Sequence, residues 1–258
     1  MIPPRIIPSL LIKNGKLVKT REFSDARYVG DPVNAIRIFN EKNVDELIIT
    51  DISATIDNRE PDYRLIEELA GECFMPLCYG GGIQNLKQAS NVFRAGAEKI
   101  AINSAALQNP GLIREIADRY GSQSVVVCMD IKRGFFGKYH LYRYATRSLE
   151  RKISIEQHLK VSLDSGAGEI FLNSVDRDGT LTGLDLDLLS KVAQHIPVPL
   201  VLGGGTKSLE DIVKAASSGA NAIAVGAFFV FYGPHRAVLI TYPTPDAIEK
   251  AFQNHART

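Results

Sequence analysis

Short apolar runs alternate with longer amphipathic segments along almost the whole chain. The runs are rich in Val, Ile and Leu and show no polar alternation, which is typical of strands buried on both faces of a parallel sheet. They span residues 5–12, 45–52, 76–82, 99–104, 125–131, 169–175, 199–205 and 222–229. Segments with helical periodicity lie at residues 32–43, 63–72, 85–95, 110–120, 155–165, 185–195 and 208–218, and a last helix is expected at 246–254. This alternation predicts an α/β fold, a (β/α)8 TIM barrel that forms one domain over residues 1–258.

The chain also contains an internal repeat. Residues 76–106 align without a gap over residues 199–229, and ten of the 31 paired positions are identical, including both glycine triplets, 80–82 and 203–205. Each copy reads as strand, glycine turn, helix and strand, which indicates a duplicated architecture. We therefore predict two similar half-barrels, with strands 1–4 in the first and strands 5–8 in the second. An open doubly wound sheet is the alternative, but it explains the duplication less simply.

Two connections after strands are longer than the others. Residues 13–31 are polar, and residues 132–153 contain alternating aromatic and polar positions that predict a small β-hairpin. In this fold the loops that follow strands build the active site. Both segments are therefore candidate lids or substrate clamps, unless they are insertions without a function.

Composition excludes several classes of protein. Of the 258 residues, 45% are hydrophobic and 23% charged, the net charge is +1, and no basic block suggests a nucleic-acid partner. No apolar stretch approaches the roughly 20 residues of a membrane helix, and the amino-terminal segment has no signal-peptide pattern. Cys73, Cys78 and Cys128 follow no ligand spacing, so we expect buried free thiols rather than a metal site. We expect a soluble cytoplasmic protein with no metal, cofactor or membrane partner.

The two glycine triplets are candidate phosphate sites. Each ends a strand and precedes a helix, so its backbone can approach an anion closely and helix amides can point at that anion. The next strand ends in Asn103-Ser104 in the first copy and in Gly226-Ala227 in the second. Loops at these positions of such barrels commonly bind phosphate. Two such sites predict a substrate with a phosphate at each end; the alternative is that the glycines only form tight turns.

Asp130 is the leading candidate for acid–base catalysis. It ends strand 5 at the barrel mouth, where a carboxylate is typical of a catalytic group, although a cap or an ion pair is the alternative. Its counterpart in the repeat is Leu11, a hydrocarbon. A duplicated barrel with an acid–base pair is expected to carry acids at both positions, so the two halves differ at the point where chemistry is expected.

Other polar residues near strand ends are weaker candidates. Asp176 and Asp178 follow strand 6 and are expected at the mouth with Asp51, while Gly179 next to Asp178 offers a further phosphate contact; the alternative is a simple turn. Five histidines follow no strand end and show no metal spacing, so we expect them on the surface. They are His140, His158, His195, His235 and His255.

Charged residues also begin four of the strands. Arg5, Glu46, Lys99 and Glu169 are the first or second residues of strands 1, 2, 4 and 6. They would form a ring of alternating charge at the amino-terminal face of the barrel. From the residues alone, a stabilising ring of ion pairs is the favoured interpretation.

Longer motifs follow one another in a fixed order: RIIPSLLIKNGKLVK, DELIITDISA, YGGGI, KIAINSAA, NPGLIREIADRYGSQSVVVCMDIKR and GAGEIFLNSVDRDGT. Together they resemble the cyclase subunit of imidazole glycerol phosphate synthase, from residue 5 to about residue 231. The resemblance implies a duplicated barrel that receives ammonia from a glutaminase subunit docked at its amino-terminal face. In that family ammonia crosses the barrel and attacks a doubly phosphorylated ribulosyl-formimino-carboxamide ribotide, which yields imidazole glycerol phosphate and an aminoimidazole carboxamide ribotide.

The resemblance also implies roles for individual residues. Asp130 matches the family's second catalytic aspartate, and the four strand-initial charges, Arg5, Glu46, Lys99 and Glu169, match the gate through which ammonia enters. Gln123 and Glu98 lie where the family's glutaminase-facing surface would be. The phosphate-binding elements match Gly81, Gly82, Asn103, Ser104, Asp178, Gly179, Gly204, Gly205, Gly226 and Ala227.

Departures from the family pattern lead to three hypotheses. Leu11 replaces the first catalytic aspartate, Ala227 replaces a serine, and residues 229–243 differ from the usual tail. The chain thus resembles a branch found with surface-polysaccharide genes, in which ammonia is thought to reach an enzyme that makes acetamidino sugars for lipopolysaccharide.

The first hypothesis is a synthase of the histidine pathway in which Asp130 remains. The second, slightly favoured, is ammonia delivery to a nucleotide sugar held with a third protein, an amidotransferase. The third, an aldose–ketose isomerase of the same pathway, needs two opposed carboxylates, so Leu11 argues against it.

Overall fold

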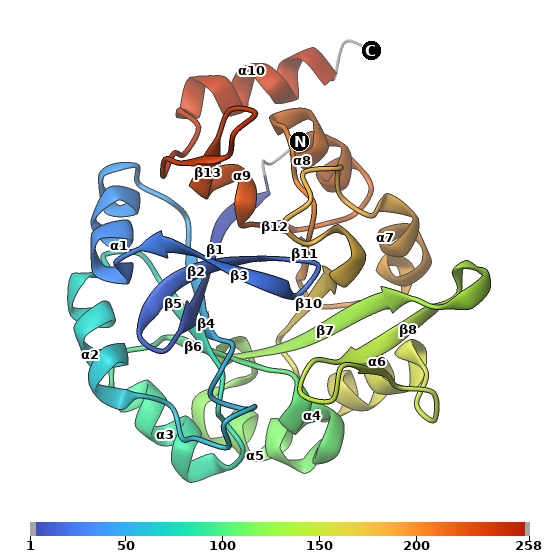
Figure 1. The fold of residues 1–258 in the computed structure, drawn as a ribbon. Helices are drawn as coiled ribbons and strands as arrows, with labels where there is room; N and C mark the ends of the chain where they lie inside the picture. The colour runs from blue at the N-terminus through green and yellow to red at the C-terminus, as the bar shows by residue number, and fades with distance from the viewer. Residues whose placement is uncertain (1–3, 256–258) are drawn as a thin grey trace.

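The computed structural model describes residues 4–255 and shows eight parallel strands closed into a barrel with helices around it (Figure 1). In order around the barrel, the strands are β1 (Arg5–Lys13), β4 (Leu47–Asp51), β5 (Leu77–Gly80), β6 (Lys99–Ile102), β7 (Val125–Arg133), β10 (Glu169–Ser174), β11 (Leu200–Gly203) and β12 (Ala222–Val225). Pairing of β12 with β1, for example Ile6 with Ile223, closes the ring. The predicted TIM barrel is confirmed.

Most of the helices between successive strands begin at side-chain caps. The principal helices are α1 (Pro32–Glu41), α2 (Tyr63–Glu72), α3 (Leu86–Arg94), α5 (Gly111–Tyr120), α6 (Ile155–Asp164), α7 (Leu186–Val192), α8 (Leu209–Ser217) and α10 (Pro245–His255). Six of them start after an Asp, Asn or Ser whose side chain accepts a hydrogen bond from the third helical amide: Asp31, Asp62, Asn85, Ser154, Asp185 and Ser208. Such caps satisfy amides that the helix leaves open, so local sequence sets these starting points.

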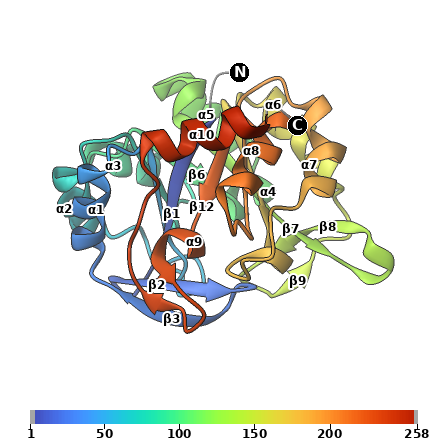
Figure 2. The same cartoon turned by 90° about the horizontal axis from the view of Figure 1, so that it is seen from above.

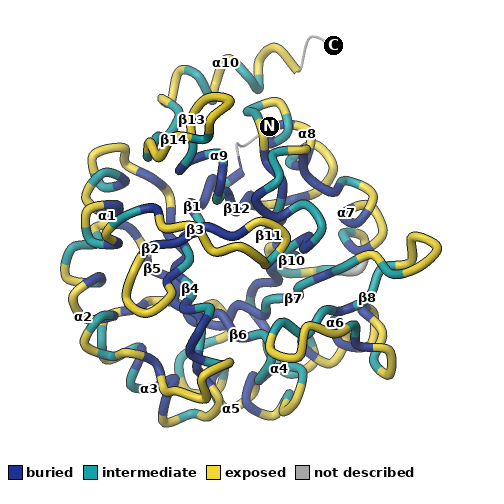
Figure 3. Tube along the Cα trace, viewed as in Figure 1, coloured by how far each residue is buried: buried dark blue, intermediate teal, exposed yellow. Residues whose placement is uncertain are grey.

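Alternating strand residues supply two separate cores. Ile6, Leu10 and Ile12 of β1 point outward into the core between sheet and helices, whereas Ile7 packs inside the barrel against Ile48 and other interior residues. Both faces of the strands are therefore apolar, which explains the runs without polar alternation. In Figure 3 the strands form the buried centre and the exposed residues gather on loops and helices.

Three hairpins extend beyond the carboxyl ends of the barrel strands. Residues 13–31, expected as a long connection, form β2 (Lys16–Arg21) and β3 (Ser24–Gly30), which cross that face of the barrel (Figure 2). The hairpin predicted in residues 132–153 is confirmed: β7 continues to Arg133 and pairs with β8 (Tyr139–Arg143), which pairs with β9 (Ser148–Leu149). A third hairpin, β13 (Phe231–Tyr232) with β14 (Ala237–Val238), follows the last barrel strand.

Two predicted strands were too long at their carboxyl ends. Residues 99–104 and 222–229 were each expected to be one strand, but the chain turns after Ile102 and after Val225 into short helices, α4 (Ser104–Gln108) and α9 (Ala227–Val230). The turning residues, Asn103 and Gly226, have similar backbone angles, with ψ of −81° and −89°. The apolar run continues from strand into helix, and hydrophobicity alone cannot separate the two elements.

The predicted duplication is visible in the backbone. The bounds of β5, β6 and α3 lie 123 residues before those of β11, β12 and α8. Sheet register also fixes a pair of equivalent positions on β1 and β7. Leu11 pairs with Thr50, and Asp130 pairs with Asn173, which lies 123 residues after Thr50. Leu11 and Asp130 therefore occupy corresponding places in the two halves.

Some expectations about burial were wrong. His158 is not a surface residue: it lies on the inner side of α6, is only 4% exposed, and burial lowers the pKa of its imidazole to about 4. Cys78 is a buried free thiol as expected, but Cys73 and Cys128 are partly exposed. Hydrophobicity scales rank histidine as polar, so the inward face of α6 was misjudged. No helix in the described part of the chain is long and apolar enough to cross a membrane.

Candidate functional site

A cavity of about 550 Å³ opens among the loops at the carboxyl ends of the barrel strands. It brings together the candidate acid and all the residues expected to bind phosphate, although these come from both halves of the chain. The expected residues that line it are Asp130, Gly81, Gly82, Asn103, Ser104, Asp178, Gly179, Gly204, Gly205, Gly226 and Ala227.

The first glycine turn packs against the strand beside it. Gly81 and Gly82 have φ of 112° and 74°, in the region that favours glycine. A Cβ on Gly81 would lie 2.3 Å from the carbonyl oxygen of Asp51, so only glycine fits there. The amide of Gly82 donates to the hydroxyl of Thr55 at 3.4 Å. The turn thus exposes backbone to the cavity where no side chain can intervene.

The second glycine turn has the same design and a different polar environment. Gly204 and Gly205 have φ of 92° and 101°, and a Cβ on Gly204 would lie 2.5 Å from the carbonyl oxygen of Ser174. The following residue, Thr206, lines the cavity and is only 4% exposed, yet its hydroxyl has no hydrogen-bond partner among the described residues. A buried hydroxyl without a partner is costly, so a ligand oxygen at this turn would satisfy it.

Lys19 completes the wall beside this second turn, and the sequence reasoning missed it. Its ammonium group donates to Asp178 at 2.7 Å, while Thr20 donates to the other carboxylate oxygen at 3.0 Å. A Cβ on Gly226 would lie 3.0 Å from Cε of Lys19, so glycine makes room for this side chain. The only sequence signal was that Lys19 lies in the long connection after strand 1. Folding of β2 over the mouth places it in the cavity.

Asp130 lies inside the cavity with an environment suited to proton transfer. Its two carboxylate oxygens accept hydrogen bonds from Asn103 at 2.6 Å and from Asn173 at 3.4 Å. Burial, together with the charge of Asp178, raises its pKa to about 7, although the hydrogen bonds from the two asparagines oppose the shift. A carboxyl group with a pKa near neutrality can both give and take a proton at physiological pH.

The position of the first half that corresponds to Asp130 carries no acid. Leu11 lines the cavity and pairs with Thr50 in the sheet, as Asp130 pairs with Asn173. Ser9, two residues earlier on β1, also lines the cavity. At these two corresponding positions, the cavity therefore has a carboxyl group from the second half and a hydrocarbon side chain from the first half.

The other candidate acids serve the loops. Asp51 lines the cavity, but one of its oxygens accepts from Ser53 and Ala54 and the other pairs with Arg59 at 3.5 Å, so this carboxylate holds the turn after β4. Asp176, expected at the mouth, instead accepts from the amide of Arg133 at 2.7 Å and does not line the cavity. The 3-10 turn of residues 175–177 rotates Asp176 away while it leaves Asp178 facing inward.

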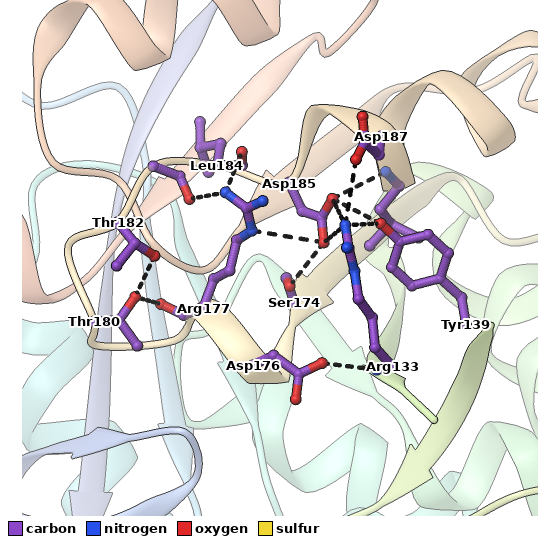
Figure 4. A network of polar contacts seen from close by, with 12 residues as sticks. Arg133, Tyr139, Ser174, Asp176, Arg177, Thr180, Thr182, Leu184, Asp185 and Asp187 are labelled. Carbon is purple, nitrogen blue, oxygen red and sulfur yellow. Dashed lines mark hydrogen bonds and ion pairs between the residues drawn. The ribbon is translucent and has the colours of Figure 1, made fainter. Parts of the chain in front are cut away.

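An ion network behind the cavity fixes the β7–β8 hairpin (Figure 4). Asp185 is 1% exposed and accepts from Tyr139 at 2.8 Å and from Arg133 at 3.1 Å; it also caps α7 through the amide of Leu188. Arg133 and Tyr139 belong to the hairpin, whereas Asp185 starts α7. The network therefore ties the long connection after β7 to the second half-barrel and keeps its base in place.

The predicted ring of charges forms at the opposite end of the barrel. Lys99 donates to Glu46 at 3.0 Å and to Glu169 at 2.9 Å, and Arg5 pairs with the same two carboxylates. Both glutamate side chains are 4% exposed, whereas those of Arg5 and Lys99 are 32% and 20% exposed. Although burial opposes it, the two carboxylates raise the pKa of Lys99. All four charges are thus held in one compact, neutral cluster.

An apolar layer separates this cluster from the cavity. It consists of barrel-interior residues such as Ile7, Ile48, Cys78 and Val126. Phe171 belongs to the layer and also lines the cavity, as do two alanines of the layer, Ala101 and Ala224. A small neutral molecule that passed the charge cluster would therefore travel along apolar side chains before it met Asp130.

Comparisons with known proteins extend over nearly the whole barrel. The family model described as histidine biosynthesis protein matches residues 5–235. A Pseudomonas aeruginosa protein provisionally named imidazole glycerol phosphate synthase subunit hisF2 is 49% identical over 252 residues, which cover 96% of this chain and 99% of that protein. A Leptospira interrogans protein provisionally named as the subunit HisF is 47% identical, covering 98% and 100%. The Streptococcus mutans imidazole glycerol phosphate synthase subunit HisF is 39% identical, covering 90% and 92%.

Proposed function

We propose that this chain, which belongs to the histidine biosynthesis protein family, is a barrel subunit of the imidazole glycerol phosphate synthase type that uses ammonia from a glutaminase. Within that role it is specialised: it delivers ammonia to an acceptor other than the usual ribulosyl substrate. The acceptor in this proposal is a nucleotide sugar bound with a third, amidotransferase protein, in the formation of acetamidino sugars for lipopolysaccharide.

The observation that carries the specialisation is Leu11. This side chain lines the cavity at the position that corresponds to Asp130, so one of two expected acid–base groups is missing. Loss of a general acid or base typically lowers a rate about 10²–10⁴-fold. The glycine turns and the charge ring nevertheless keep the geometry described above. Anion binding by backbone amides and ammonia passage do not depend on a carboxyl group at position 11, whereas the complete ring-closing chemistry does.

The charge ring supports a path for ammonia. Arg5, Glu46, Lys99 and Glu169 form a cluster of ion pairs at the amino-terminal end of the barrel, and the layer above them consists of apolar residues such as Ile7 and Val126. Movement of Lys99 alone would break its two ion pairs and open the ring. Both glutamates would remain paired with Arg5, so neither carboxylate would lose its last counter-ion. Ammonia is neutral and small, so it suits an apolar passage that excludes ammonium.

The amino-terminal face offers a surface for the glutaminase. Phe74, in the connection between α2 and β5, is 87% exposed, and aromatic side chains commonly anchor protein interfaces. Gln123 is exposed on the same face, whereas Glu98 accepts a hydrogen bond from the amide of Leu77 at 2.7 Å and so also supports β5. We propose Phe74 and Gln123 as contacts of the glutaminase.

The decisive experiment is turnover of the doubly phosphorylated ribulosyl substrate with ammonium salt as nitrogen source. The proposal predicts a rate about 10²–10⁴-fold below that of a family member with both aspartates. Turnover at the level of such a member would refute the specialisation and leave the second candidate, a synthase of histidine biosynthesis. The raised pKa of Asp130 is the observation that favours this second candidate.

A second experiment tests ammonia passage. The chain is combined with a glutaminase that it captures in a pull-down, and turnover with glutamine is compared with turnover with ammonium salt. Lys99→Ala is expected to reduce only glutamine-dependent turnover. Lys87→Ala, which removes an exposed lysine of α3, is the matched control and should change neither. If no glutaminase binds, or if Lys99→Ala leaves glutamine-dependent turnover intact, the passage is wrong.

A further inference from the structure

Two hairpins that are distant in sequence meet at the outer rim of the cavity. Arg27 of β3 and Arg236 of the turn between β13 and β14 both stack on the ring of Phe231, with guanidinium carbons 5.2 and 5.8 Å from the ring centroid. Figure 2 shows β2, β3 and the β13 hairpin together on the face where the barrel strands end. Two guanidinium groups thus converge on one aromatic side chain.

These guanidinium groups lie close together and have no ion pair with a carboxylate in the part of the chain that the structure describes. Arg5, Arg37 and Arg143 each pair with a carboxylate, but among the described residues no ion pair involves Arg27, Arg236 or the neighbouring Arg21. Burial lowers the pKa of Arg236, and the charges of Arg21 and Arg27 lower it further. Like charges held together without a carboxylate repel one another, so an anion placed among them would be stabilised.

The structure holds Arg236 in this place at some cost. Its φ is +50°, in the left-handed region that is unfavourable for a residue with a Cβ. Its guanidinium group donates to the carbonyl oxygen of Gly179 at 2.5 Å, and Gly179 lines the cavity. One guanidinium edge is thereby fixed to the cavity wall, while its remaining donors stay available.

The arginines continue the wall of the second phosphate turn outward. Arg27 pairs in the β2–β3 ladder with Lys19, which lines the cavity beside Gly226. Arg21, Arg27, Arg236 and Phe231 do not themselves line the cavity. They form a separate positive rim that touches the cavity through Lys19 and Gly179.

We propose that Arg27 and Arg236, with Arg21 beside them, form an outer anion site that binds the diphosphate group of a ligand extending out of the cavity. A guanidinium group offers paired donors that match phosphate oxygens, so two such groups suit two linked phosphates. The ring of Phe231 orients both by cation–π contact. The site adds to the two glycine turns, and it joins the β2–β3 hairpin of the first half to the β13–β14 hairpin of the second.

The test is isothermal titration calorimetry with inorganic pyrophosphate at low ionic strength. Wild type should bind, and the double variant Arg27→Gln/Arg236→Gln should bind at least tenfold more weakly. Arg64→Gln, which removes an exposed arginine of α2, is the matched control and should bind within twofold of wild type. The double variant Arg27→Lys/Arg236→Lys should retain part of the affinity for pyrophosphate, because it keeps both positive charges but loses the paired donors of the guanidinium groups.

Two results would overturn the proposal: no pyrophosphate binding by wild type, or equal binding by the double variant. Circular dichroism checks that the variants are folded, and the single variant Arg27→Gln, at an exposed position, keeps the test available if the double variant unfolds. Pyrophosphate binding requires neither glutaminase nor ammonia. Failure here is therefore distinguishable from failure of the proposed ammonia-dependent function.

Discussion

The two half-barrels have closely matching glycine turns and different chemistry around them. Asn85 and Ser208, which cap the helices after the turns, have φ/ψ of −152°/166° and −156°/168°. Gly96 and Gly219, after the same helices, both have φ of 106°. In contrast, the first half places Leu11 in the cavity where the second places Asp130.

This difference separates two kinds of function. A phosphate cradle of backbone amides depends on backbone shape, so glycine, tight packing and a helix cap are enough to keep it. Proton transfer depends on one particular side chain and is lost with one substitution. A duplicated barrel can therefore keep the same turn geometry in both halves and an acid in only one, which is the asymmetry described above.

Restoring the symmetry at the cavity wall should have the largest effect. We expect Leu11→Asp to raise turnover of the doubly phosphorylated ribulosyl substrate with ammonium salt about 10²–10⁴-fold, because it supplies the missing acid–base group. Ser9 also lies on β1 and lines the cavity, so Ser9→Asp is the matched control and should give no such gain. An equal gain from both variants, or none from Leu11→Asp, would contradict the correspondence with Asp130.

Removing the remaining acid should change how stability depends on pH. Between an unfolded-state pKa near 3.8 and a folded-state pKa of about 7, the folded chain binds more protons at Asp130 than the unfolded chain does. The free energy of unfolding should therefore fall as pH rises through this window, by ~2–4 kcal/mol relative to Asp130→Asn. Urea unfolding of both proteins from pH 4 to 8 measures this. Parallel curves would show that the pKa of Asp130 is not raised.

The glycine turns should be equally intolerant in the two halves. Gly81→Ala and Gly204→Ala would each bring Cβ within 2.5 Å of a carbonyl oxygen at a positive φ, so we expect each to lower the free energy of unfolding by ~2–4 kcal/mol. Gly15→Ala, also at positive φ but with open space around Cβ, should cost only about 1 kcal/mol. Urea unfolding compares them. A large difference between Gly81→Ala and Gly204→Ala would break the structural equivalence of the turns.

The smallest expected effect concerns Thr206, whose counterpart in the first turn is Ile83. Thr206→Val removes a hydroxyl that has no hydrogen-bond partner in the described part of the chain and keeps the shape, so stability should stay the same or rise by about 1 kcal/mol. Affinity for inorganic phosphate should fall about threefold to tenfold if that hydroxyl binds a ligand oxygen. Calorimetric titration and thermal unfolding measure the two quantities. Unchanged phosphate affinity would remove Thr206 from the second cradle.

Much of the fold could be predicted because several signals agreed. The predicted helix at residues 63–72 has the bounds of α2, since its cap and its apolar face fall at the same place. The strand predicted at residues 222–229 failed because its apolar run passes through Gly226 into α9 without a change in hydrophobicity. The repeat located the cavity residues, since equivalent strand ends must meet at one end of a barrel. It could not locate Lys19, which reaches the cavity only because β2 folds over the mouth.

The sequence by itself determined the barrel, its duplication, the glycine turns and the replacement of an acid by Leu11, because periodicity, repeats and backbone-specific residues are written along the chain. Only the tertiary structure decided which groups act together. It placed Asp130 beside two asparagines, turned Asp176 outward, left the hydroxyl of Thr206 without a partner among residues 4–255, and stacked Arg27 and Arg236 on one ring. Burial and electrostatic interaction depend on distances between residues far apart in the chain, and folding alone sets those distances.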